Sequence, residues 1–438
     1  MRKQIIESIS IFWFRRDLRL KGNLGLFHAL KTRENVLPVF IFDPVIFNAS
    51  HQPHRRETFV YEELTKLKRE LEEIGCSLYI LQGKPIEAFK RLSKDFRICS
   101  VYSNRGYEPY FVQRDAEIYA FIDSIGATFH SFKDHVIFDQ DELLLPDGSP
   151  CTDFASYSKR WKNKLNRLVL APCPTEKYFY NFIRIKPFPL PSMEELGFKP
   201  ASNNFPSKEI PVKLLENYAQ KHQYPALNGT SCVGVHLRFG TIGIRYLTAL
   251  ADVNSEAFLE KLIWRNFYMD VLYHFPGLVT ESYNLAYDNI EWRNNKEEFD
   301  RWCEGTTGFP LVEAGMRELN STGLMHHRCR MVAAGFLTKH LLIDWRWGEA
   351  YFASKLLDYE LASSIGCWQW IVGSGCEAIP YFQILNPELQ AKKFDPDNEY
   401  IRKWIPEYGT DDYPAPMVDH EMARERAITT YRKALVGE

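Results

Sequence analysis

Short apolar segments alternate with amphipathic helical patterns over the first 135 residues. The apolar segments are rich in β-branched and aromatic side chains, which predicts buried strands; they are 8–14, 36–42, 78–81, 98–102 and 128–132. Between them, residues 56–74 and 111–125 repeat apolar positions every three or four residues, which predicts helices. This alternation indicates βαβ units, and therefore an α/β domain with a doubly wound parallel sheet.

The pattern changes after residue 135. Residues 140–215 hold 10 of the 24 prolines, which predicts an extended connector with one helix-like piece near 153–168. From residue 214 onward, helical periods dominate and no strand pattern is convincing. We therefore expect an α/β domain at 1–135, a Pro-rich linker at 136–213 and an all-α domain at 214–438. The helix candidates in the last segment are 213–222, 231–250, 255–275, 295–303, 310–319, 325–343, 347–361 and 417–435.

Composition narrows the class of protein. Apolar residues make up 45% of the chain and the net charge is −2, so any site for a polyanion must be a local patch. The nine cysteines form no CxxC pair, which argues against a metal site and for reduced thiols in the cytoplasm. We find no apolar run of membrane-spanning length and no signal peptide in MRKQIIESIS, and we expect a cytoplasmic monomer.

The indoles are concentrated in the C-terminal half of the chain. Eight of the ten tryptophans lie between Trp264 and Trp404. The segment 358–370, DYELASSIGCWQW, combines two acids, several small residues and two indoles. Small residues such as Gly366 would let a flat ligand approach the backbone closely. The alternative interpretation is an exposed helix end followed by two core aromatics.

Two polar segments leave alternatives open. The loop 15–23, RRDLRLKGN, follows the first strand, where an open α/β sheet binds ligands, but it could equally be a solvated basic turn. Gly229-Thr230-Ser231 precedes a helical segment; its hydroxyls and amides could hold a phosphate or could simply cap the helix.

Two charged motifs need partners. Trp264 and Arg265 offer a stacking face beside a charge, or alternatively an aromatic core helix with Arg265 in an internal salt bridge. Arg328 and Arg330 lie near the start of an apolar helix and require anions if they are buried, and Asp358 and Glu360 are the natural candidates.

Several long motifs resemble the photolyase/cryptochrome family. They are WFRRDLRL (13–20), GTS (229–231), LIWRNFY (262–268), WCEGTTGFPLVEAGMRELNSTG (302–323), MHHRCRM (325–331), FLTKHLLIDWRWGE (336–349), CWQW (367–370) and YFQILNP (381–387). The resemblance runs nearly end to end. It implies an α/β antenna domain joined by a long linker to a helical domain that binds FAD, as in bacterial class I-type enzymes.

The resemblance also implies which residues bind FAD. Arg330 would lie over the isoalloxazine ring, paired with Asp358, where a fixed positive charge stabilises the reduced anionic flavin. Thr230 and Ser231 would hold the diphosphate. The full implied set is Tyr218, Thr230, Ser231, Cys232, Val233, Gly234, Phe258, Arg330, Asp358, Glu360 and Ser364.

Two further groups follow from the resemblance. Trp368, Trp345 and Trp292 match the family's electron-transfer chain, with Trp368 nearest the flavin. The lesion site would be formed by Lys261, Trp264, Met331 and Trp370. The implied activity is splitting of cyclobutane pyrimidine dimers in UV-damaged DNA by an electron from reduced flavin, after the lesion has been flipped out of the duplex.

Four positions depart from the family pattern. Lys261 replaces a glutamate, His327 an asparagine, Ser364 the asparagine that faces the reactive flavin nitrogen, and Gly234 a hydroxyl residue. A cationic donor in place of a carboxylate reverses the local electrostatics. These departures motivate two alternatives: a cryptochrome-like photoreceptor with little or no repair activity, and repair of (6-4) lesions.

The second chromophore is left open. The polar pair that holds folate in some bacterial members is Tyr110-Phe111 here, which disfavours folate on that model. Another antenna chromophore, or none, remains possible.

Overall fold

The computed structural model describes residues 8–47, 54–201 and 204–436. Residues 1–7, which begin the segment inspected for a signal peptide, lie outside this part of the chain. Two compact units are present. Unit 1 comprises the described residues of Met1–Glu142, Asn163–Glu209 and Cys232–Asp252, and unit 2 those of Leu143–Lys162, Ile210–Ser231 and Val253–Glu438.

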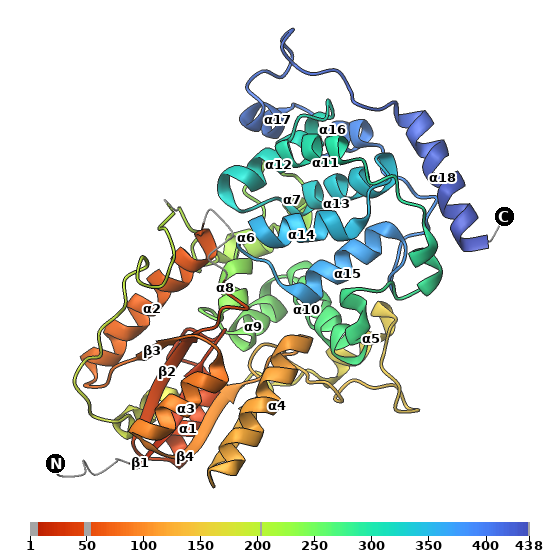
Figure 1. Cartoon of the computed structure of the whole chain (residues 1–438). Helices are drawn as coiled ribbons and strands as arrows, with labels where there is room; N and C mark the ends of the chain where they lie inside the picture. Colours follow the sequence, from red (N-terminus) through yellow and green to blue (C-terminus); the bar gives the residue numbers. More distant parts are fainter. Residues whose placement is uncertain (1–7, 48–53, 202–203, 437–438) are drawn as a thin grey trace. The chain divides into compact units, whose positions relative to one another are not determined.

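Unit 1 is built on one parallel sheet. Its strands are β1 (Ser8–Phe14), β2 (Val36–Phe42), β3 (Tyr79–Gln82), β4 (Arg97–Asn104) and β5 (Thr128–Phe132), in the order β3-β2-β1-β4-β5 (Figure 1). The predicted parallel sheet is therefore confirmed. Pro38 lies inside β2, which is not an edge strand, but the pairing of β2 with β3 begins only at Val39. The proline thus avoids a position where β3 would need its missing N–H.

Helices cover this sheet as the amphipathic patterns predict. They are α1 (Leu24–Thr32), α2 (Arg55–Glu73), α3 (Pro85–Asp95) and α4 (Pro109–Ser124), and α3 and α4 both begin with a proline, which suits a first helical turn. The later parts of unit 1 add the 3-10 helix η1 (Thr175–Asn181), α8 (Gly234–Phe239) and most of α9 (Ile244–Asn254).

The Pro-rich segment is largely extended and lies along unit 1. Its contacts include Ile183 N to Val36 O (3.1 Å), Phe188 N to Ser77 Oγ (3.0 Å) and Gln82 Nε2 to Leu196 O (2.9 Å). Its first part, Leu143–Lys162, instead belongs to unit 2 and contains most of α5 (Phe154–Lys164).

In unit 2, the regular structure of the described residues is entirely helical, as predicted. The elements are α6 (Val212–Glu216), α7 (Tyr218–Lys221), α10 (Glu256–His274), η2 (Pro276–Val279), η3 (Leu285–Asn289), α11 (Lys296–Glu304), α12 (Pro310–Thr322), α13 (His327–Gly335), η4 (Phe336–His340), α14 (Trp345–Lys355), α15 (Leu361–Val372), α16 (Pro387–Phe394), α17 (Glu399–Trp404) and α18 (His420–Val436). The element η4 is a π-helix, a type that often marks functional sites.

Helix α15 is the centre of the candidate site and packs against α10, α13 and α14 (Figure 1). Two glycines permit this close packing. A Cβ on Gly366 would lie 2.1 Å from Tyr268 Cδ1 on α10, and a Cβ on Gly348 of α14 would lie 2.3 Å from Trp368 Cη2. The absence of a side chain at Gly366 therefore serves helix packing, and the approach of a flat ligand to the small residues of this segment stays a prediction.

Candidate active site

The centre of the site is an ion pair between α13 and the turn before α15. Arg330 Nη2 donates to both carboxylate oxygens of Asp358, at 3.0 and 2.9 Å, and its Nε donates to Met325 O at 2.9 Å. The predicted pairing of these two residues is confirmed. Arg330 Nη1 makes no hydrogen bond within the described chain, and 28% of the side chain is exposed. One edge of a fixed guanidinium group thus remains available to a ligand.

The second predicted acid has a different partner. Glu360 pairs with Arg265 of α10 at 3.0 Å, and both side chains are almost buried. Arg328 instead donates to Gln223 Oε1 and lies 4.0 Å from the ring centroid of Phe394. We expected Asp358 and Glu360 to form ion pairs with Arg328 and Arg330. This prediction is confirmed only for Asp358 with Arg330. The internal salt bridge considered for Arg265 is the observed arrangement.

Helix α10 supplies the aromatic side of the site. Ser255 caps its first turn, with Oγ accepting from Phe258 N at 3.4 Å. The Phe258 ring meets Tyr218 edge-on at 5.2 Å. Trp264 is stacked on Phe154 of α5, with ring centroids 3.6 Å apart and an interplanar angle of 9°, and remains half-buried. The sequence did not indicate this stacking partner, because 110 residues separate the two rings and only the packing of α5 brings them together.

Lys261 and His327, two of the departures from the family pattern, lie within electrostatic range of each other. Burial lowers the pKa of His327 to about 3, and the positive charges of Lys261, Arg330 and Arg328 add to the effect. The His327 side chain is nevertheless exposed, as is that of Cys367 on α15. Desolvation by the surrounding protein and the nearby cations together disfavour its protonated form. His327 is therefore neutral at pH 7 and offers hydrogen bonds rather than charge.

Met331 on α13 and Trp370 on α15 are half-buried, and their helices pack against each other. Together with Lys261 and Trp264 of α10, they complete the side chains that were expected to form a lesion site. All of them come from helices that contact α15 or belong to it.

Ser364 on α15 has a partner that sequence reasoning missed. Its Oγ donates to Glu349 Oε1 at 2.9 Å, and Tyr359 OH donates to the same oxygen at 2.8 Å. Burial raises the pKa of the Glu349 carboxyl, against the lowering effect of these two hydrogen bonds. The available signal was the lone acid of α14, which lies between Trp347 and Tyr351 in the sequence.

The three tryptophans of the expected electron-transfer chain differ in exposure. Trp368 and Trp345 are 3% and 1% exposed, whereas Trp292 is partly exposed. Trp368 and Trp345 lie on the packed pair α15 and α14. Backbone contacts place the segment after Trp292 beside the start of α14: Arg293 N donates to Leu342 O at 2.7 Å, and Asp344 N donates to Asn294 Oδ1 at 2.8 Å. Trp345 and Trp368 are thus both interior and Trp292 is nearer the surface, while the order of electron transfer among the three stays a prediction.

The Gly-Thr-Ser motif does not cap a helix. Helix α8 begins at Gly234 with Val233 as its N-cap residue, and no side chain caps it. Thr230 and Ser231 belong to unit 2, whereas Cys232, Val233 and Gly234 belong to unit 1. Cys232 adopts a left-handed φ of 51°. The capping interpretation is thus wrong, and phosphate binding by the hydroxyls of the motif stays a prediction.

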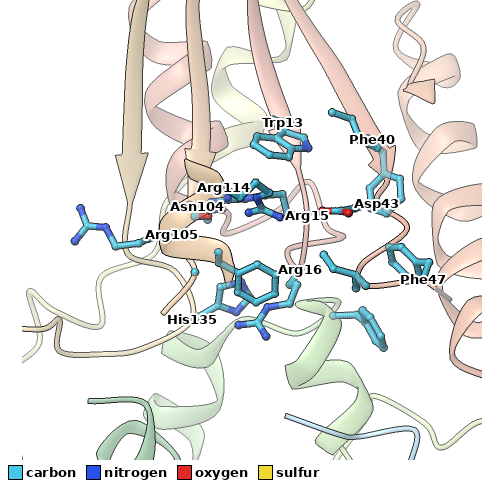
Figure 2. Close-up of a pocket in the computed structure, with 15 residues that line it drawn as sticks. Trp13, Arg15, Arg16, Phe40, Asp43, Phe47, Asn104, Arg105, Arg114 and His135 are labelled. Carbon is cyan, nitrogen blue, oxygen red and sulfur yellow. Dashed lines mark hydrogen bonds and ion pairs between the residues drawn. The ribbon is translucent and has the colours of Figure 1, made fainter. Parts of the chain in front are cut away.

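Unit 1 contains a separate recess at the carboxyl ends of β1, β2 and β4 (Figure 2). The loop after β1 is not a solvated turn: Arg15 pairs with Asp115 at 2.5 Å, Arg16 with Glu108 at 2.6 Å and Arg19 with Asp134 at 2.5 Å. Within the recess, the guanidinium groups of Arg15 and Arg114 lie 4.9 and 4.7 Å from the Trp13 ring centroid. The remaining cavity is about 20 Å³, room for about one water molecule.

Two further classes of site were checked over the described residues. No cluster of three or more His, Cys, Asp or Glu side chains there could hold a metal ion. No helix in that part of the chain is long and apolar enough to cross a membrane.

Comparison with known proteins identifies the family. Residues 10–177 match the DNA photolyase family, and residues 258–410 match the FAD binding domain of DNA photolyase. A deoxyribodipyrimidine photo-lyase of Synechococcus sp. is 32% identical over 98% of this chain and 98% of its own length. A bacterial class III photolyase from Agrobacterium tumefaciens superposes with a TM-score of 0.87, at 28% identity over 99% of both chains. An archaeal photolyase from Sulfolobus tokodaii, described with two FAD molecules, superposes with a TM-score of 0.81, at 30% identity over 97% of this chain and 100% of its own.

These matches extend over both units and include the Arg330–Asp358 pair and the three tryptophans. The chain therefore belongs to the DNA photolyase family.

Proposed function

We propose that this protein is an FAD-dependent photolyase that splits cyclobutane pyrimidine dimers in UV-damaged DNA under blue light. The observation that carries the proposal is the ion pair of Arg330 and Asp358, with one edge of the guanidinium group left open. A half-buried arginine held in this way stabilises negative charge that develops on a neighbouring ring.

The residues present fit an FAD molecule. Arg330 Nη1 has no hydrogen-bond partner among the described residues, and Ser364 presents a hydroxyl from the adjacent helix. Glu360 is neutralised by Arg265, so it adds no unpaired negative charge to the site. We propose that Thr230 and Ser231 hold the diphosphate, and that Tyr218 and Phe258 of the same unit line the site.

When bound, FAD supplies a light-absorbing redox centre that gives an electron to a pyrimidine dimer and takes it back. The protein's tryptophans provide the route by which electrons enter. Trp368 is buried beside α14 and is the proposed first donor, Trp345 refills it, and Trp292, which is partly exposed, exchanges with solvent. Burial of the inner two indoles keeps water away from them.

We propose that the flipped lesion is held between Trp264, Met331 and Trp370. Trp264 is fixed by stacking on Phe154, so it offers a rigid aromatic surface at little entropic cost. A distorted dimer is cheaper to flip than an intact base pair, which favours damaged DNA. Lys261 supplies a cation beside neutral His327, and we assign these two residues to hydrogen bonding of the lesion.

The decisive experiment uses photoreduced holoprotein and an oligonucleotide with one cyclobutane dimer. Under blue light we expect thymine absorbance to return, and we expect Trp264→Ala to weaken binding of the damaged strand by about 1–3 kcal/mol, the range for loss of one stacking platform. A parallel reaction with a (6-4) oligonucleotide tests the alternative lesion. Repair of neither lesion would refute the enzyme proposal.

That negative outcome would support the second candidate, a cryptochrome-like photoreceptor. What favours it is that Lys261 and His327, two departures from the family pattern, lie within electrostatic range of each other. A photoreceptor predicts photoreduction through Trp368 without repair, so Trp368→Phe would abolish the light response while dimer-containing DNA stayed unchanged.

The recess in unit 1 does not fit a second aromatic chromophore as it stands. Arg15 and Arg114 occupy the space against Trp13, and the remaining cavity holds about one water molecule. We propose that this protein carries FAD in unit 2 as its single chromophore. Chromatography of the pigments released from heat-denatured holoprotein tests this, and a folate or a second flavin in stoichiometric amount would overturn it.

Organisation and location complete the proposal. We propose that residues 1–135 form the antenna-type domain, 136–213 the linker and 214–438 the FAD domain, and that the protein is a cytoplasmic monomer. Limited proteolysis tests the domain bounds, sedimentation tests the oligomeric state, and fractionation of cells tests the location.

A further inference from the structure

Glu349 is held at the junction of α14 and α15 by two hydroxyl groups. Tyr359 OH and Ser364 Oγ donate to the same oxygen, Oε1, at 2.8 and 2.9 Å. Tyr359 lies in the turn between the two helices, so the acid is fixed from its own helix, the turn and the following helix. This arrangement fixes the position of the carboxyl group relative to Ser364.

Within the described chain, no cation forms an ion pair with this carboxyl. The arginines on the surrounding elements are engaged elsewhere: Arg330 with Asp358, Arg265 with Glu360, and Arg346 of α14 with Asp288. Burial therefore raises the pKa of Glu349, and only the two hydroxyls oppose it. The carboxyl keeps its proton to a higher pH than an exposed glutamate does.

A serine hydroxyl can pass a proton on, because it accepts and donates at one atom. With Glu349 protonated, its O–H can donate to Ser364 Oγ, and the serine hydrogen is then free to point at another acceptor. Loss of that hydrogen to the acceptor draws the carboxyl proton onto Oγ. Glu349 is left as a carboxylate that accepts from both hydroxyls, which is the arrangement observed.

An asparagine at this position could not do the same. Its amide accepts at oxygen and donates at nitrogen, so an incoming and an outgoing proton would use different atoms. The departure at position 364 therefore adds a chemical capability, and the acid behind it supplies the proton.

We propose that Glu349 is the proton reservoir of the active site and that Ser364 relays its proton to the flavin ring. This inference rests on the proposed function, which places the ring beside Ser364. For the first electron that Trp368 supplies, Glu349 supplies one proton through Ser364 to a ring nitrogen. A second electron, taken up without a proton, leaves the negative charge that Arg330 stabilises. Glu349 then recovers a proton from water.

The first test reads the proton itself. Infrared difference spectra of the holoprotein, taken before and after blue light, should lose a protonated-carboxyl C=O band that shifts in D₂O. Glu349→Gln should remove the band, and Glu304→Gln, which changes an exposed acid at the end of α11, should leave it intact. A light-induced band that persists in Glu349→Gln would overturn the assignment.

The second test separates proton from electron transfer by transient absorption. Glu349→Gln and Ser364→Ala should each slow protonation of the flavin by at least about 10-fold, a modest loss for a positioned proton donor. The appearance of the tryptophan radical should be unchanged. Ser364→Thr keeps the hydroxyl and should restore the rate, which a merely structural role of residue 364 would not require.

The two levels of proposal fail in different ways. If Trp368→Phe leaves photoreduction unchanged, the proposed electron route is wrong. If Trp368→Phe abolishes photoreduction but Glu349→Gln protonates the flavin at the wild-type rate, the electron route stands and the proton relay is refuted. Melting temperatures of all variants identify any that lose their fold, and Ser364→Thr then carries the comparison against wild type.

Discussion

Gly348 fixes the position of Trp368, and substitution by alanine should displace that indole. A Cβ at residue 348 would lie 2.3 Å from Trp368 Cη2 and 2.4 Å from Leu337 Cδ2. Favourable carbon–carbon contacts are about 3.5–4.0 Å, so the neighbours must move by about 1 Å or more. Trp368 is 3% exposed and Leu337 is fully buried, so neither can turn into solvent.

The magnitude follows from comparison with a second helical glycine. Overpacking a close-packed core costs about 1–3 kcal/mol, and replacing a helical glycine with alanine returns about 0.5–1 kcal/mol. At Gly335 of α13, the nearest atoms to a new Cβ are 3.9 and 4.0 Å away, so Gly335→Ala gains the propensity term without a clash. The propensity terms cancel between the two variants, and their difference isolates the packing cost.

The assay is thermal unfolding of the holoprotein, followed by the photoreduction rate. At about 2–4 °C per kcal/mol for a unit of this size, Gly348→Ala should melt about 2–12 °C below Gly335→Ala. Its photoreduction should also be slower, because the proposed first electron donor has moved. Equal melting temperatures and equal photoreduction rates would show that the close fit around Gly348 does not hold Trp368 in place.

Two further predictions concern charge. Asp358→Ala should weaken FAD binding at least about 10-fold, because it removes two charge-assisted hydrogen bonds from half-buried Arg330. Asp358→Asn should lose less FAD affinity. The control Asp288→Ala, which removes the surface partner of Arg346, should leave FAD affinity unchanged in a fluorescence titration. Burial lowers the pKa of His340 to about 3, so below pH 6.5 the unfolded chain binds a proton that the folded protein does not, and stability falls as the pH falls. His340→Gln can keep the contact to His420 Nδ1 (2.9 Å). It should reduce the loss of stability between pH 7 and 5.5 by about 1 kcal/mol, measured by thermal unfolding at both pH values. An unchanged pH dependence of stability would contradict this.

The strands of unit 1 were predictable because each is encoded locally. An apolar run of four to eight residues, bounded by polar segments, specifies a buried parallel strand without reference to distant residues. The observed bounds of β1, β2 and β5 equal the predicted ones, while β4 extends to Asn104. That extension was not predicted because Ser103 and Asn104 are polar. Both are buried, and Asn104 donates to Asp17 Oδ2 at 2.6 Å, a partner 87 residues away.

Helix α15 was not predicted, because its sequence carries no clear local signal. Ala362, Ile365, Trp368, Gln369 and Ile371 are all buried in it, so no continuous polar face marks a helical period. The helix packs against α10, α13 and α14, and its less buried positions, such as Gly366, Cys367 and Trp370, carry no charged side chain. The most central element of the candidate site was therefore the one that hydrophobic periodicity could not detect.

The choice of ion-pair partner could not be predicted either. The sequence shows that Arg265, Arg328 and Arg330 need partners if they are buried, and that Asp358 and Glu360 are nearby in the chain. Only the packing of α10 on α15 gives Glu360 to Arg265, which is 95 residues away. Sequence supplies the charges, and tertiary packing decides how they pair.

The hydrogen-bond partner of Ser364 was likewise not predictable from the sequence, and that partner decides what a substitution at residue 364 should do. An alcohol is too weak an acid to supply a proton at neutral pH by itself, so serine alone would leave the site without a donor. The hydrogen bond to Glu349, 15 residues earlier and on the preceding helix, changes this, because burial raises the pKa of that carboxyl. Ser364→Asn should therefore act through Glu349: it should remove the relay while leaving the acid in place, and Glu349→Gln should add little further effect to it. Additive effects of the two substitutions would show that residues 349 and 364 act independently.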